Sequence, residues 1–194
     1  FVATLTAKAE AVELNYPDIS KGHIGPFIFD KQASIVAAQI KDAVQAGARV
    51  TTGGEILNHG GGRWLRPTVI ADVTHDMDIM REETFGPVIP VMAYDSIEEA
   101  ITLANDTSFG LSGAVYAGSI DEAHDIGRHI NAGAISLMDG ALTGQYFEAG
   151  KQSFKNSGLG PSRMGANGFL RFFRQKAYIA NTICPLTIDD FKES

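Results

Sequence analysis

The chain has very little cysteine, no long apolar run and no excess of basic residues. Of its 194 residues only Cys184 carries a thiol, which excludes an internal disulfide and favours a reducing compartment, so we expect a cytoplasmic protein. Without a long uncharged apolar stretch, the sequence predicts no membrane span. The formal net charge of -7 argues against nucleic acid or an anionic membrane as a partner, because phosphate groups bind to basic surfaces.

The sequence gives no indication of a metal site. The five histidines are His23, His59, His75, His124 and His129. Only the last two are close together, and their spacing does not place both on one face of a helix. Cys184 lies in the string NTICPLT without a histidine or an acid beside it, which favours an incidental thiol over a nucleophile.

The composition is that of a globular protein, with 44% apolar and 20% charged residues. Apolar residues at helical spacing predict helices at 1–14, from an N-cap at Asp30 to Gly47, at 96–106 and at 119–130. Strands are predicted at 48–54, 66–73, 110–118 and 132–138, and after Gly86-Pro87, whereas the glycine-rich residues 55–63 predict a loop. Ser96 with Glu99, and Ser119 with Glu122, predict two capping boxes. Strands that alternate with helices predict an α/β fold with an open, parallel-rich sheet flanked by helices.

The string REETFGPVIPV, from Arg81 to Val91, places two acids in front of the predicted buried strand. A carboxylate such as that of Glu83 can accept hydrogen bonds from both hydroxyls of a ribose, and Phe85 offers a flat surface to a ring. Gly86 permits close backbone approach and Pro87 stiffens the turn. These residue types suit a nucleotide sugar. The commoner alternative is a solvated acidic pair beside a core phenylalanine.

The longer string REETFGPVIPVMAYDSIEEAITLANDTSFGLSGAVYA (81–117) resembles the aldehyde dehydrogenase superfamily. The shared features are E-x-F-G-P-V, an aliphatic strand, the EEAI helix and the string LANDT followed by FGLS. Further similarity lies in FVATLTAKAEAV at the start of the chain and in IGPFIFDKQ (24–32). The resemblance runs from Phe1 to about Thr182, and it implies most of that family's catalytic domain.

The resemblance implies roles for three residues. Glu83 corresponds to the glutamate that accepts hydrogen bonds from the hydroxyls of the nicotinamide ribose. Phe85 corresponds to the phenylalanine that packs against the nicotinamide end of the cofactor. Gln32 corresponds to a glutamine near the ribose side of the same site. The implied cofactor is NAD or NADP, and the implied partner is a small-molecule aldehyde, oxidised to a carboxylic acid through a cysteine thiohemiacetal and thioester.

The family's nucleophilic cysteine belongs to a segment that would precede Phe1, so no catalytic residue is assigned here and these 194 residues alone are expected to be inert. Two positions also depart from the family: Met138 stands where an asparagine is common, and Lys151 where a phenylalanine is common. A non-catalytic oligomerisation or regulatory module that retains the fold therefore stays an alternative. An acyl-phosphate reductase of the same superfamily is a further one.

The last part of the chain resembles the family's oligomerisation strand. We expect a partial catalytic domain at 1–171 and a C-terminal β arm and tail at 172–194. An apolar terminal strand left exposed would invite uncontrolled pairing, so we expect it to build a homodimer or homotetramer. The alternative is a strand that covers the edge of its own sheet.

Overall fold

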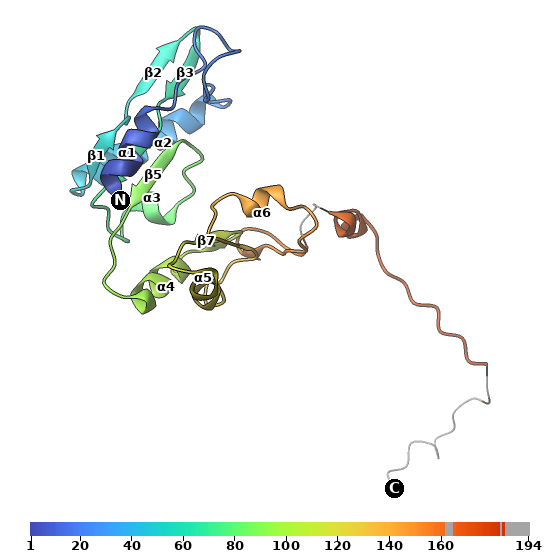
Figure 1. Cartoon of the computed structure of the whole chain (residues 1–194). Helices are drawn as coiled ribbons and strands as arrows, with labels where there is room; N and C mark the ends of the chain where they lie inside the picture. The colour runs from blue at the N-terminus through green and yellow to red at the C-terminus, as the bar shows by residue number, and fades with distance from the viewer. Residues whose placement is uncertain (162–164, 183, 185–194) are drawn as a thin grey trace. The chain divides into compact units, whose positions relative to one another are not determined.

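The structure is a computed structural model, and it describes residues 1–161, 165–182 and 184 (Figure 1). The chain divides into two compact units. The first contains Phe1–Ser108 and His124–Asn131, and the second contains Phe109–Ala123 and the residues from Ala132 onward. One of these boundaries falls within helix α5 (Ile120–Gly127).

The first unit is built on a three-stranded sheet with β4 (Thr68–Ala71) at its centre. β1 (Arg49–Thr52) pairs with β4 in the antiparallel direction, and β5 (Val88–Val91) pairs with it in the parallel direction. All four residues of β4 are buried, which is typical of a strand covered on both faces.

Helices α1 (Val2–Glu10) and α2 (Asp30–Gln45) cover opposite faces of this sheet (Figure 1). Ile70 belongs to the main core cluster together with Val36 and Ile40 of α2. Since side chains alternate along a strand, Val69 faces the other side, where α1 packs on β1 and β4. Further members of the cluster come from the rest of the first unit: Ala43, Ala48, Leu65, Val73, Met77 and Ile79.

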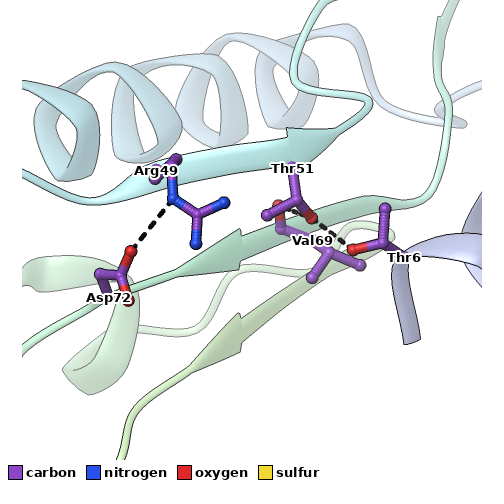
Figure 2. A network of polar contacts seen from close by, with 5 residues as sticks. All are labelled: Thr6, Arg49, Thr51, Val69 and Asp72. Carbon is purple, nitrogen blue, oxygen red and sulfur yellow. Dashed lines mark hydrogen bonds and ion pairs between the residues drawn. The ribbon is translucent and has the colours of Figure 1, made fainter. Parts of the chain in front are cut away.

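Polar contacts fix the edge of the sheet beside α1 (Figure 2). The hydroxyl groups of Thr6 and Thr51 lie 2.7 Å apart, and the Thr51 hydroxyl donates to the carbonyl of Val69 at 3.3 Å. At the other end of β1, Arg49 pairs with Asp72 at 3.2 Å. This ion pair is exposed, so it contributes little to stability.

A β-hairpin replaces the loop predicted at 55–63. Strands β2 (Ile56–His59) and β3 (Gly62–Leu65) pair in the antiparallel direction. Gly60 and Gly61 have φ values of 57° and 79°, as a two-residue type I′ hairpin turn requires. The three glycines therefore mark a tight turn between strands, and the prediction of a loop was wrong.

The start of α2 also differs from the prediction. Asp30 is the first helical residue, and the N-cap is Phe29, whose backbone is extended and whose side chain supplies no hydrogen bond. Asp30 still lies in the first turn, where its negative charge interacts favourably with the helix dipole. At the other end, Gly47 adopts a φ of 106° after the helix stops at Gln45, as predicted for a glycine terminator.

Both predicted capping boxes are confirmed, in α4 (Ile97–Asn105) and in α5. The Ser96 hydroxyl accepts from the Glu99 amide at 3.1 Å, and the Ser119 hydroxyl accepts from the Glu122 amide at 3.1 Å. In each case the glutamate carboxylate accepts from the amide one residue before the serine, that of Asp95 or of Gly118.

The described residues of the second unit form two strand pairs. β6 (Phe109–Gly110) pairs antiparallel with β9 (Phe154–Lys155), and β7 (Gly113–Val115) pairs parallel with β8 (Ile135–Leu137). The remaining elements are α3 (Asp78–Arg81) in the first unit, and α6 (Leu142–Gln145) and the 3-10 helix η1 (Ala166–Phe172) in the second. The α/β class is confirmed, and the sheets mix parallel and antiparallel pairs.

The described residues that follow η1, at 173–182 and 184, form no strand, and the other residues of the predicted C-terminal β arm lie outside the described part of the chain. Pairing of this arm with another subunit stays a prediction, as does a domain boundary at residue 171. In the described residues no helix is both long enough and apolar enough to span a bilayer.

Candidate functional site

The predicted site residues Glu83 and Phe85 lie on the loop from Glu82 to Pro87, hereafter the 82–87 loop. It joins α3 to β5. The α3 helix ends at Arg81, and its C-cap is Glu82. The Glu82 amide donates to the carbonyl of Asp78 at 2.8 Å, and the Glu82 backbone is extended. The paired acids therefore stand in front of β5, as the sequence predicts, and they follow a short helix that the sequence did not predict.

Three contacts hold the 82–87 loop in place. The side-chain amide of Gln32, in the first turn of α2, donates to the carbonyl of Thr84 at 2.8 Å. Gly86 lies against Val36, since a Cβ atom there would come within 3.0 Å of a Val36 methyl group. The carbonyl of Pro87 accepts from the amide of Thr68 at 2.8 Å, which ties the end of the loop to β4.

A pocket of about 380 Å³ opens where the loop meets the segment before α2. This size lies within the range of about 300–1,000 Å³ that is usual for small-molecule sites. Most of the lining is apolar, and Gln32 is the one described lining residue with a polar side chain. The lining residues are Ile24, Gly25, Pro26, Phe27, Ile28, Phe29, Gln32, Leu65, Phe85, Gly86 and Pro87.

The structure brings Phe85 and Gln32 together in this pocket. Phe85 has a φ of 41° and is 73% exposed, so the alternative in which it fills the core is excluded. A positive φ is unusual for a bulky residue, and it marks a backbone held by its surroundings. The anchors on Thr84 and Gly86, on either side of Phe85, supply that restraint.

Glu83 lies on the same loop, and it does not line the pocket itself. Its side chain is exposed and, in the described part of the chain, makes no hydrogen bond or ion pair with another residue. Both carboxylate oxygens are therefore available as acceptors. Its role in binding stays a prediction.

Arg63 supports the site and was not found from the sequence. Its guanidinium donates to the carbonyl of Asp30 at 3.1 Å and to the hydroxyl of Ser34 at 2.7 Å, and it lies 3.6 Å from the Asp30 carboxylate. These contacts fix the first turn of α2, which carries Gln32. The partners are 29 and 33 residues away along the chain, and no local pattern marks them.

The two positions that depart from the family pattern make contacts of their own within the second unit. The sulfur of Met138 accepts from the amide of Ala117 at 3.3 Å, and the Lys151 ammonium donates to the carbonyl of Thr143. Cys184 is exposed. Across the described residues no group of three His, Cys, Asp or Glu side chains is arranged to hold a metal ion.

Comparisons with known proteins agree on one family. The sequence model described as the aldehyde dehydrogenase family matches residues 1–178. Succinate-semialdehyde dehydrogenase [NADP(+)] 2 of Schizosaccharomyces pombe is 31% identical over 88% of this chain and 34% of its own length.

Solved structures give the same result. The structure of PutA from Anabaena variabilis matches with a TM-score of 0.90 and 49% identity, over 97% of this chain and 40% of that one. Betaine aldehyde dehydrogenase of Staphylococcus aureus, solved in complex with NAD+, matches with a TM-score of 0.84 and 27% identity, over 98% of this chain and 38% of that one.

The chain spans about a third of the length of the curated relatives it matches. The family match, by contrast, covers most of this chain, and the fold agrees with solved members of the family. The chain therefore belongs to the aldehyde dehydrogenase family.

Proposed function

We propose that the chain is part of an enzyme that oxidises a small aldehyde to a carboxylic acid with NAD or NADP, and that the 82–87 loop binds the nicotinamide end of that cofactor. The observation that carries this proposal is the pairing, on one restrained loop, of an exposed aromatic ring with an unpaired carboxylate. Phe85 and Glu83 are the two residues concerned.

The local chemistry fits a nicotinamide riboside. The pocket beside Phe85 is mostly apolar, which suits a flat ring, and a free carboxylate two residues away suits a pair of ribose hydroxyls. The names of relatives support the cofactor class, since one is an NADP-dependent dehydrogenase and another was solved with NAD+.

When bound, the nicotinamide ring accepts a hydride from the substrate carbon. The residues of this chain contribute position to that reaction. Glu83 orients the ribose by accepting hydrogen bonds from its hydroxyl groups, and Phe85 packs against the nicotinamide ring. Gln32 holds the loop that carries Glu83 and Phe85. Orientation of this kind lowers the activation barrier, because the translational and rotational entropy of the cofactor is already lost on binding and not in the chemical step.

The nucleophilic cysteine of the reaction is proposed to lie outside these 194 residues, so the chain alone is proposed to be inert. Cys184 is not given that role. The exposed apolar side chains of Tyr178 and Ile179, in the C-terminal segment, support assembly into a homodimer or homotetramer. A cytoplasmic location completes the proposal.

The test compares Glu83→Gln with Glu82→Gln in the full polypeptide that carries this chain. Both residues are exposed and adjacent, so the pair is matched in position and in charge lost. We expect Glu83→Gln to weaken NAD+ or NADP+ binding roughly tenfold in calorimetric titration, because charge-assisted hydrogen bonds are lost, and Glu82→Gln to leave it unchanged. Equal affinities for the two variants would remove the proposed role of Glu83.

A further inference from the structure

Phe29 occupies a position where a phenylalanine does nothing for the helix that follows. It is the N-cap of α2, and its side chain makes no capping hydrogen bond. Residues such as Ser, Thr, Asp and Asn are preferred there, because their side-chain oxygen accepts from a free amide in the first turn. Phe29 leaves that turn without a side-chain cap.

Packing does not explain Phe29 either. Its side chain is 63% exposed, and it is not part of the core cluster. Two residues earlier, Phe27 packs partly buried against that cluster, and the Phe27 amide donates to the carbonyl of Arg63 at 2.8 Å. Phe27 therefore anchors the segment, and Phe29 is left with an exposed ring and no internal role.

What Phe29 does is line the same pocket as Phe85 and Gln32. The pocket is thus lined by two largely exposed aromatic residues, Phe29 just before α2 and Phe85 on the 82–87 loop. Gln32 is the lining residue with a side-chain amide. A residue that breaks a local rule of helix formation without a gain in packing is often kept for function. Here the function available is contact with a ligand.

We propose that Phe29 is a ligand-contacting residue of this pocket and that its ring binds the planar ring at the nicotinamide end of the cofactor. The inference rests on the proposed function, and it adds a second aromatic contact to that of Phe85. It also implies that the first turn of α2 is less stable than it would be with a capping residue at position 29, and that the aromatic ring there serves binding.

This implication yields a test in which stability and binding change in opposite directions. Phe29→Ser removes the ring and adds a capping hydroxyl, whereas Phe29→Leu removes the ring and adds no cap. Phe29→Tyr keeps the ring. All three are made in the full polypeptide, and NAD+ affinity is measured by calorimetric titration alongside amide hydrogen exchange in the first turn of α2, at Lys31 and Gln32.

We expect Ser and Leu to weaken NAD+ binding about three- to tenfold, as loss of an aromatic contact predicts, and Tyr to retain it. The Gln32 amide already donates to the carbonyl of residue 29 at 3.0 Å. In the absence of cofactor, Ser is therefore expected to slow amide exchange at Lys31, while Leu is not. A Phe29→Ser variant that binds the cofactor of the parent protein, NAD+ or NADP+, as tightly as the parent does overturns the inference.

The Glu83→Gln variant separates this inference from the proposed function. If Glu83→Gln weakens NAD+ binding and Phe29→Ser does not, the role of Phe29 is wrong while the nicotinamide site stands. If neither variant changes the affinity, the site itself is wrong and the inference falls with it.

Discussion

The side-chain amide of Gln32 and the backbone carbonyl of Thr84 are joined by a hydrogen bond of 2.8 Å. This bond links the first turn of α2 to the loop that carries Glu83 and Phe85. Arg63 holds the same turn through the Asp30 carbonyl and the Ser34 hydroxyl. The loop is thus supported by side chains that are distant in sequence, and its geometry depends on them.

Replacement of Gln32 by Leu should loosen the 82–87 loop. The variant keeps the side-chain size but cannot donate to Thr84, and a hydrogen bond of this kind contributes about 0.5–1.5 kcal/mol. We expect NAD+ affinity to fall by a factor of roughly 2 to 10. Amide exchange at Thr84 and Phe85 should become faster without cofactor present, which an effect on ribose contact alone would not produce.

Gln39, on the same helix, provides the matched control. It is buried, and within the described residues its side-chain carbonyl oxygen has no hydrogen-bond partner. Gln39→Met should therefore leave NAD+ affinity unchanged and raise the free energy of unfolding by about 1 kcal/mol, because a buried unsatisfied polar atom is removed. A loss of affinity in Gln39→Met would show that changes in α2 reach the loop by some route other than Thr84.

Substitution of Gly53 by Ala should lower the free energy of unfolding much more than the same substitution at Gly61. Both glycines have positive φ, 72° and 79°. A Cβ atom at Gly53 would lie 2.5 Å from the Thr68 hydroxyl and 2.6 Å from the Pro67 carbonyl, whereas Gly61 has no atom within 4 Å of that position. Urea denaturation should show a loss of about 1 kcal/mol for Gly61→Ala and about 3 kcal/mol for Gly53→Ala. Similar losses would mean that backbone strain, and not the contact with β4, governs both sites.

The acid stability of the chain should depend on Thr74. The Thr74 hydroxyl donates to the Asp76 carboxylate and lowers the pKa of Asp76 below its usual value of 3.8. A carboxyl group whose pKa is lowered on folding stabilises the folded state above its unfolded pKa, and this contribution disappears as the pH falls through the lowered value.

Thr74→Val should therefore be less stable than the parent chain at pH 6, and the difference should vanish below the lowered pKa of Asp76. Carbon-detected NMR titration of the Asp76 carboxyl should show its pKa rising toward 3.8 in the variant. An unchanged pKa would mean that the other groups that lower it, among them His75 and Arg81, are sufficient.

Interactions between near neighbours in sequence were predictable. The two capping boxes follow from the spacing of Ser96 with Glu99 and of Ser119 with Glu122, and both form. The string from Glu83 to Pro87 is distinctive in residue type, and it identified the loop before any coordinates. These features depend on residues three or four positions apart, which a single sequence displays directly.

Other features depend on conformation or on distant partners. Gly60 and Gly61 were read as loop residues because three glycines in a row conceal a two-residue turn that only backbone angles reveal. Phe29 was missed because the residue-type preference favours Asp30 as the N-cap. Arg63 was missed because it lies in the hairpin strand β3, and only the folded structure places it beside Asp30 and Ser34 of α2.

The connectivity of β4 has a consequence for the order of folding. A contact such as that between Thr51 and Val69 spans 18 residues, whereas the one between Gly110 and Ser157, beside the β6–β9 pair, spans 47. Closing a short segment costs less chain entropy, and local topologies fold faster. We therefore expect β1 and β4 to pair on the nascent polypeptide before β6 and β9 have found each other.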